Sequence, residues 1–136
     1  MTVQDLQSLT SALPTLKITP ETTPPEAAAA PRILGSFNQC SLGLVRFSGQ
    51  PPWELHPDDE LLHVLDGEVQ LTLLTDSGPD RIRLRPNSLY VVPWGIWHRS
   101  LARAPVTLIF GTSSEGNKHS FAEDPRTDPN PVAFGS

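Results

Sequence analysis

The chain contains a single cysteine, Cys40, among its 136 residues. No disulfide can form within one chain, so nothing in the composition asks for an oxidising compartment. No stretch approaches the ~18 apolar residues of a membrane-spanning helix, and the sequence does not begin with a basic segment followed by an apolar run. We therefore expect a cytoplasmic protein with no membrane partner.

Basic residues are also scarce. Ten Lys and Arg stand against fifteen Asp and Glu, which gives a formal net charge of −5. Recognition of nucleic-acid phosphates needs clustered Lys and Arg, so we expect no nucleic-acid partner. Long helices are not expected either, because the chain carries fifteen prolines, which interrupt helices and favour turns and strand edges.

A chain of this length supports one domain with one hydrophobic core. Residues 1–31 are predicted as an N-terminal arm or linker, because a proline-rich stretch there surrounds a run of alanines. Residues 32–111 contain short β segments with turn signals at roughly 8–12-residue spacing, which is typical of a sandwich or barrel. Residues 112–136 are polar and proline-rich and are predicted as a C-terminal tail.

Two of the predicted β segments, residues 60–65 and 68–74, are joined by Asp66-Gly67. An Asp-Gly pair between two apolar segments favours the tight turn of a β-hairpin, because glycine adopts positive φ without steric cost. The sequence therefore predicts that these two strands pair with each other.

Acidic and imidazole side chains recur in two β segments that are far apart in the sequence. Glu54 and His56 lie two residues apart in one segment, so their side chains project to the same face of a strand. Glu60 follows after a short polar turn, and His98 ends the segment 93–98. Two imidazoles and up to two carboxylates that converge inside β-structure make a site for a divalent metal ion.

The residues around His56 resemble the first motif of the cupin superfamily. That motif runs Gly, a few residues, His-x-His, three or four residues, Glu, six residues, Gly. Gly49, His56, Glu60 and Gly67 take these places, and Glu54 stands where the first His of the motif would be. The gap between Gly49 and Glu54 is one residue shorter than the usual spacing.

The residues around His98 resemble the second cupin motif, which runs Gly, five residues, Pro-x-Gly, two residues, His, three residues, Asn. Pro93, Gly95 and His98 match it. Asn87 stands in for the glycine of the motif, and Ala102 replaces its closing asparagine. The two motifs occur in the expected order and are separated by a strand-rich stretch.

The resemblance covers roughly residues 33–111 and implies an all-β fold. The expected architecture is a single cupin-type β-barrel (a jelly-roll-like double-stranded β-helix) with a flexible N-terminal arm. The resemblance also implies a homodimer and a divalent metal ion inside the barrel, with Fe, Mn, Zn, Ni or Co as candidates. The implied metal ligands are Glu54, His56, Glu60 and His98.

Both carboxylates have an alternative interpretation. Glu54 can form hydrogen bonds or act as a base beside the metal without binding it. Glu60 can be a surface carboxylate of an acidic turn. Among the other histidines, His63 is expected to be structural or to lie at an interface, because strand alternation directs it away from Glu60. His119 is expected to be solvated in the tail.

Three functions remain open at this stage. The first is a small-molecule metalloenzyme, dioxygenase-like or isomerase-like, in which the ion leaves open positions for a small-molecule substrate. The second is a cupin that binds or senses a ligand without catalysis. The third is a barrel whose metal site has decayed, because one histidine and the closing asparagine of the motifs are replaced. The fold alone does not choose among them, since this fold hosts many chemistries.

Overall fold

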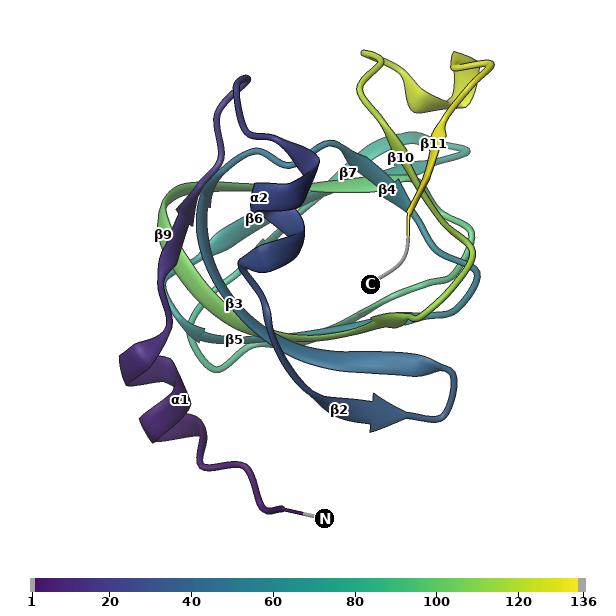
Figure 1. Cartoon of the computed structure of the whole chain (residues 1–136). Helices are drawn as coiled ribbons and strands as arrows, with labels where there is room; N and C mark the ends of the chain where they lie inside the picture. The colour runs from purple at the N-terminus through teal and green to yellow at the C-terminus, as the bar shows by residue number, and fades with distance from the viewer. Residues whose placement is uncertain (1, 135–136) are drawn as a thin grey trace.

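The computed structural model describes residues 2–134 and shows a curled β-sheet that wraps into a barrel (Figure 1). The described residues leave out Met1, Gly135 and Ser136, which are the outermost ends of the predicted arm and tail. The strands are, in chain order, β1 (Thr15–Lys17), β2 (Arg32–Phe37), β3 (Cys40–Gly49), β4 (Trp53–Leu55), β5 (Glu60–Asp66), β6 (Val69–Thr75), β7 (Gly78–Leu84), β8 (Leu89–Val92), β9 (His98–Ser113), β10 (Asn117–Ser120) and β11 (Val132–Phe134).

Three short helices accompany these strands: α1 (Leu6–Ala12), α2 (Pro24–Ala29) and the 3-10 helix η1 (Pro125–Thr127). In residues 2–134, no helix has the length and apolar character needed to cross a membrane. The all-β barrel expected from the sequence is thus confirmed.

The long strand β9 joins the two halves of the barrel. Its C-terminal half pairs with β3 and β5, and its N-terminal half pairs with β4 and β6. The pairings with β3 and β5 both shift register near residues 102–107 of β9, and a local irregularity of this kind lets one strand bend from one sheet into the next. β9 is therefore one continuous strand of sixteen residues that belongs to both halves of the barrel.

The hydrophobic core lies between the two halves of the sheet. β5 and β6 both alternate buried and half-buried residues, as strands with one inward face do. The inward side chains form one cluster: Phe47, Leu62, Val64, Val69, Leu71, Leu73, Leu84, Val92, Ala102, Val106 and Leu108. Burial of each large member contributes roughly 1.5–3 kcal/mol, and the cluster fixes the strands that carry the polar site described below.

The predicted hairpin at Asp66-Gly67 is wrong. β5 pairs with β8 and β9, whereas β6 pairs with β7 and β9, so the turn carries the chain from one half of the barrel to the other. Gly67 has a φ of 76°, and a Cβ placed there would collide with the carbonyl oxygen of Pro105. Glycine is therefore required by a close approach to the bend of β9 rather than by a two-residue hairpin.

The N-terminal segment lies on the outside of the barrel. β1 pairs in parallel with β3, and the Arg46 guanidinium of β3 donates hydrogen bonds to the carbonyl oxygens of Leu13 (2.7 Å) and Thr10 (3.0 Å). The segment predicted as an extended arm thus includes two short helices and a strand that holds it to the barrel. Leu44, on the same outward face of β3 as Arg46, is fully buried although it is outside the core cluster.

The described part of the predicted tail extends the sheet. β10 pairs with β4 and β11 pairs with β10, and Figure 1 shows both as neighbouring strands at the C-terminal edge. Many side chains of the segment after residue 111 face solvent, which explains its polar sequence. Its backbone nevertheless pairs with the sheet. This addition brings β10 next to β4, which pairs with β9 and carries one of the candidate ligands.

Candidate metal centre

Strand register places the candidate ligands on one inward face. β4 lies between β9 and β10, and a single row of paired residues crosses the three strands: His98, Glu54 and His119. Paired residues of neighbouring strands share a face, so these side chains project together. His56 follows Glu54 by two residues and returns to that face. Glu60 begins β5 and is also directed inward, because its alternate residues Leu62 and Val64 belong to the core.

The donor atoms of Glu54, His56, Glu60 and His98 all lie within 4.8 Å of one another. Nε2 of His56 is 3.3 Å from Oε2 of Glu54 and 3.4 Å from Oε2 of Glu60. Nε2 of His98 is 3.1 Å from Oε1 of Glu60 and 4.0 Å from Oε2 of Glu54. Neighbouring donors bound at about 2.1 Å to one ion lie about 3.0–3.4 Å apart, so most of these spacings suit a shared ion.

Burial divides the cluster into two parts. The side chains of His56, His98 and Glu60 are 2%, 3% and 8% exposed, whereas the side chain of Glu54 is 28% exposed. Two imidazoles and one carboxylate are therefore enclosed, and the second carboxylate lies on the side nearer to solvent. A buried carboxylate needs a partner of opposite charge or strong hydrogen-bond donors. Glu60 has such a donor in Thr112, whose hydroxyl donates to Oε2 at 2.5 Å.

Hydrogen bonds outside the cluster orient both imidazoles. Nδ1 of His56 lies 2.8 Å from Oδ1 of Asn117, and the Asn117 amide nitrogen donates to the carbonyl oxygen of Ser113. Nδ1 of His98 lies 2.9 Å from the carbonyl oxygen of Ile96. Because both partners are acceptors, each Nδ1 carries the proton and donates it. Each ring then presents Nε2 to the cluster, as metal-binding histidines do.

Nε2 of His56 supplies the test of whether the cluster fits a metal ion. This atom is buried, yet it forms no hydrogen bond of acceptable geometry within residues 2–134. A buried polar atom without a well-formed hydrogen bond is costly, and a coordinate bond would satisfy it. Together with one further imidazole and two carboxylates, it gives a donor set that suits Mn, Fe, Co, Ni or Zn. The residues present therefore fit a divalent transition-metal ion.

Protons and a metal ion compete for this cluster. Burial opposes the charge of His56, but contacts with Glu54 and Glu60 outweigh it and raise the pKa of His56 to about 10. The pKa of His98 is raised as well, against its burial, by Glu60 and then Glu54. Without an ion, the two carboxylates thus favour protonation of both imidazoles. A metal ion binds the neutral form of imidazole, so its uptake displaces protons from the cluster.

The two carboxylates stay ionised in this environment. Burial acts to raise the pKa of Glu60, but contacts with His56 and His98 outweigh it and lower the pKa to about 2. Burial acts in the same direction on Glu54, and contacts with His119 and His56 hold the pKa of Glu54 well below its usual range. Both side chains therefore offer negatively charged oxygen donors across the physiological pH range.

The structure brings together all four residues that the sequence singles out, Glu54, His56, Glu60 and His98. Sequence reasoning missed Asn117, which orients His56, and it placed His119 in solvent. Instead, Nε2 of His119 lies 3.4 Å from Oε1 of Glu54, and its ring stacks on another aromatic side chain. Asn117 and His119 are two residues apart in a short polar segment, and this spacing is the sequence signal for a shared inward face.

Comparison with protein families supports this geometry. A family model described as a cupin domain matches residues 44–110, which include all four clustered residues. A search of curated proteins finds no match. Many solved structures share the fold, and their identities to this chain are low enough that the likeness concerns the fold alone.

One similar structure is a cupin-2 domain protein from Shewanella frigidimarina, with 22% identity and a TM-score of 0.63 over 82% of this chain and 94% of that chain. A hydroquinone 1,2-dioxygenase in complex with Cd²⁺ and 4-hydroxybenzonitrile has 23% identity and a TM-score of 0.53, over 60% of this chain and 61% of that chain. A hydroquinone 1,2-dioxygenase from Sphingomonas with 4-hydroxybenzoate bound has 20% identity and a TM-score of 0.55, over 68% of each chain.

Proposed function

This chain belongs to the cupin superfamily, and from that premise we propose that it is a metal-dependent enzyme acting on a small molecule, with dioxygenase-like chemistry. The observation that carries the proposal is the enclosed group of His56, His98 and Glu60, with the buried Nε2 of His56 left without a hydrogen bond. Two imidazoles and one carboxylate with open positions are the ligand set of non-haem Fe(II) oxygenases.

The proposed ligands are Glu54, His56, Glu60 and His98, and the proposed ions are Fe, Mn, Zn, Ni and Co, with Fe favoured by the enclosed group. In such a centre the ion supplies Lewis acidity and open coordination positions. The residues of this chain hold the donors, keep the imidazoles in the correct tautomer and exclude water on the side of the core. The side of Glu54 is the more exposed one, so we propose that a substrate approaches from there.

Dioxygenase-like chemistry is preferred to isomerase-like chemistry for a second, comparative reason. Two of the similar structures are hydroquinone 1,2-dioxygenases, and one of them contains Cd²⁺.

The alternative functions are a cupin that binds a ligand without catalysis and a barrel with a decayed site. A cytoplasmic location and the absence of a nucleic-acid partner stay predictions of the sequence.

Purified protein without a histidine tag is expected to contain or take up about one divalent ion per chain, measured by elemental analysis and by titration. After loading with Fe²⁺ under anaerobic conditions, oxygen consumption would be followed with hydroquinone and a panel of hydroxylated aromatic acids. Metal binding without oxygen consumption would favour the ligand-binding alternative. Absence of bound metal, with no thermal shift on adding Mn, Fe, Co, Ni or Zn, would establish the decayed site.

We also propose that the protein is a homodimer that assembles through the outer face of the first half of the barrel. The register aligns Leu42, Gly111, Leu61 and Val91 in one row across β3, β9, β5 and β8. An added Cβ at Gly111 would contact Leu42 and Leu61, as expected if this row lies close together on one face. Leu89 and Val91 on β8 are 64% and 48% exposed. A second copy would cover such a continuous apolar row.

Light scattering at micromolar concentration is expected to give a dimer for the wild-type protein and a monomer for Val91→Glu. The substitution introduces a charge into the apolar row while leaving the core intact, because Val91 faces outward. Gln70→Glu on β6 is the matched control, since it adds the same charge to a strand of the other half of the barrel. A monomeric wild-type protein, or a dimer that survives Val91→Glu unchanged, would contradict the proposed interface.

A further inference from the structure

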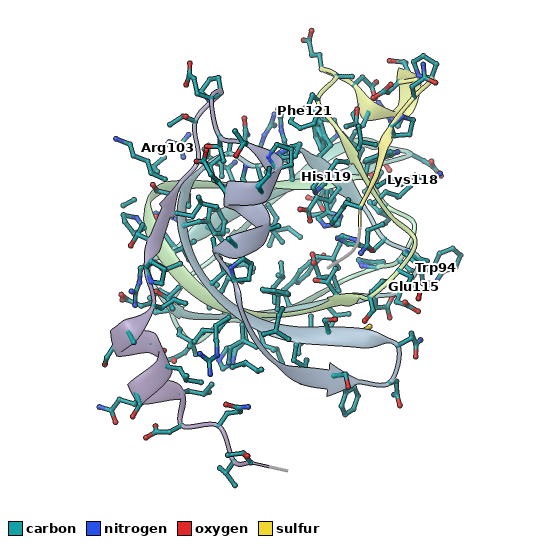
Figure 2. All side chains as sticks on the ribbon, in the orientation of Figure 1. Trp94, Arg103, Glu115, Lys118, His119 and Phe121 are labelled. Atoms are coloured by element: carbon teal, nitrogen blue, oxygen red, sulfur yellow. The ribbon has the colours of Figure 1, made fainter. Side chains whose placement is uncertain are left out.

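His119 lies next to the candidate metal centre, although it comes from a strand outside both sequence motifs. It is paired with Glu54 in the register of β10 and β4, and its Nε2 is 3.4 Å from Oε1 of Glu54. Both His119 and Lys118 are labelled in Figure 2; strand alternation directs Lys118, which is exposed, to the opposite face of β10. Only His119 of the two is therefore directed at the site.

An aromatic contact fixes the orientation of the His119 ring. The ring stacks on Phe134 with a centroid distance of 3.5 Å and an interplanar angle of 20°. Phe134 also meets His56 edge-on, with centroids 6.1 Å apart. Offset or edge-on aromatic contacts of this kind limit the positions that a ring can adopt. His119 is thus held between β11 and Glu54 rather than free to turn into solvent.

The two oxygens of Glu54 have different surroundings. Oε2 is directed at the cluster, 3.3 Å from Nε2 of His56 and 4.0 Å from Nε2 of His98. Oε1 is directed at His119. The side chain of Glu54 is also the most exposed of the four, so the enclosing core does not hold it as it holds Glu60. A separate contact is needed to keep one oxygen of Glu54 on the cluster.

We infer that His119 is a positioning residue for Glu54: it holds Oε1, so that Oε2 is presented to the metal as a single oxygen donor. The inference rests on the proposed metal site and extends it by one residue from β10. Partners of this type, which contact a ligand rather than the ion, orient the ligand and tune the affinity of the centre. In this chain the partner supports the carboxylate that replaces the first histidine of the cupin motif.

The test is a titration of tag-free protein, stripped of metal, with Co²⁺, whose visible absorption reports the number and kind of its ligands. His119→Ala is expected to weaken Co²⁺ binding by about 10–100-fold and to change the Co²⁺ spectrum. His119→Gln should retain most of the affinity, because its amide N–H reaches as far as Nε2 and can donate to Oε1. His119→Asn, which is shorter, should behave like His119→Ala.

Lys118→Ala is the matched control, since it alters the neighbouring, outward-facing residue of the same strand and should leave binding unchanged. Far-UV circular dichroism and melting of the metal-free variants check that each one folds. If His119→Ala does not fold, the comparison of His119→Asn with His119→Gln decides the question.

Two results would overturn the inference. One is wild-type affinity and spectrum in both His119→Ala and His119→Asn. The other is an equal loss in His119→Gln and His119→Asn, because the imidazole itself would then be required and His119 would act as a direct ligand. If the wild-type protein does not bind Co²⁺, the proposed metal site fails, which is a different outcome from either of these.

Discussion

His98→Ala is expected to raise the dissociation constant for a divalent ion by more than about 100-fold, since loss of even an outer partner of a ligand costs 10–100-fold. His98 is 3% exposed and its Nε2 lies 3.1 Å from Oε1 of Glu60. Removing it deletes one of two imidazole donors and leaves Glu60 with less compensation for its buried charge. The measurement is a Co²⁺ or Zn²⁺ titration followed by calorimetry.

His56→Ala should have an effect of similar size, because His56 supplies the other imidazole. His63→Ala is the matched control, because it also removes an imidazole. His63 lies on β5 and pairs with Leu89 and Ile109, away from the cluster. It should bind metal as the wild-type protein does. Equal affinities for His98→Ala and His63→Ala would remove His98 from the ligand set.

The candidate ligands were predictable because their placement depends on local rules. Glu54 and His56 share a face through the two-residue period of a strand, and Glu60 follows a turn whose length the first motif defines. His98 required more than a local rule. It pairs with Glu54 in the register of β4 and β9, but the two residues are 44 positions apart in the sequence. There the resemblance to the second motif replaced the missing long-range information.

The register of strands that pair far apart in sequence could not be predicted. Asp66-Gly67 has the composition of a hairpin, but the sequence does not encode that β9 bends across this turn and takes both neighbours as partners. In the same way, His119 sits in a polar segment that resembles a tail. Its inward direction arises only because β10 pairs with β4, which places it opposite Glu54.

Glu54→Gln is expected to weaken metal binding by about tenfold or more, in the range found when the surroundings of a metal centre are disturbed. The substitution keeps the size of the side chain and replaces a charged oxygen donor by a neutral amide. Oε2 of Glu54 lies 3.3 Å from Nε2 of His56, so this oxygen is placed among the other donors. Glu54→Ala should weaken binding as well, because it removes the donor entirely.

Glu54→His should still bind a metal ion, because it restores the imidazole of the cupin motif at that position. The centre would then be more cationic by one formal charge, and a more cationic centre lowers the pKa of bound water because less of the dication's charge is neutralised.

The alternative role for Glu54, a base that does not touch the ion, makes the opposite prediction for the glutamine variant. In that case Glu54→Gln binds Co²⁺ with wild-type affinity and an unchanged spectrum but loses turnover. Since the Gln variant retains the shape of the site, its Co²⁺ titration separates loss of a ligand from loss of a base.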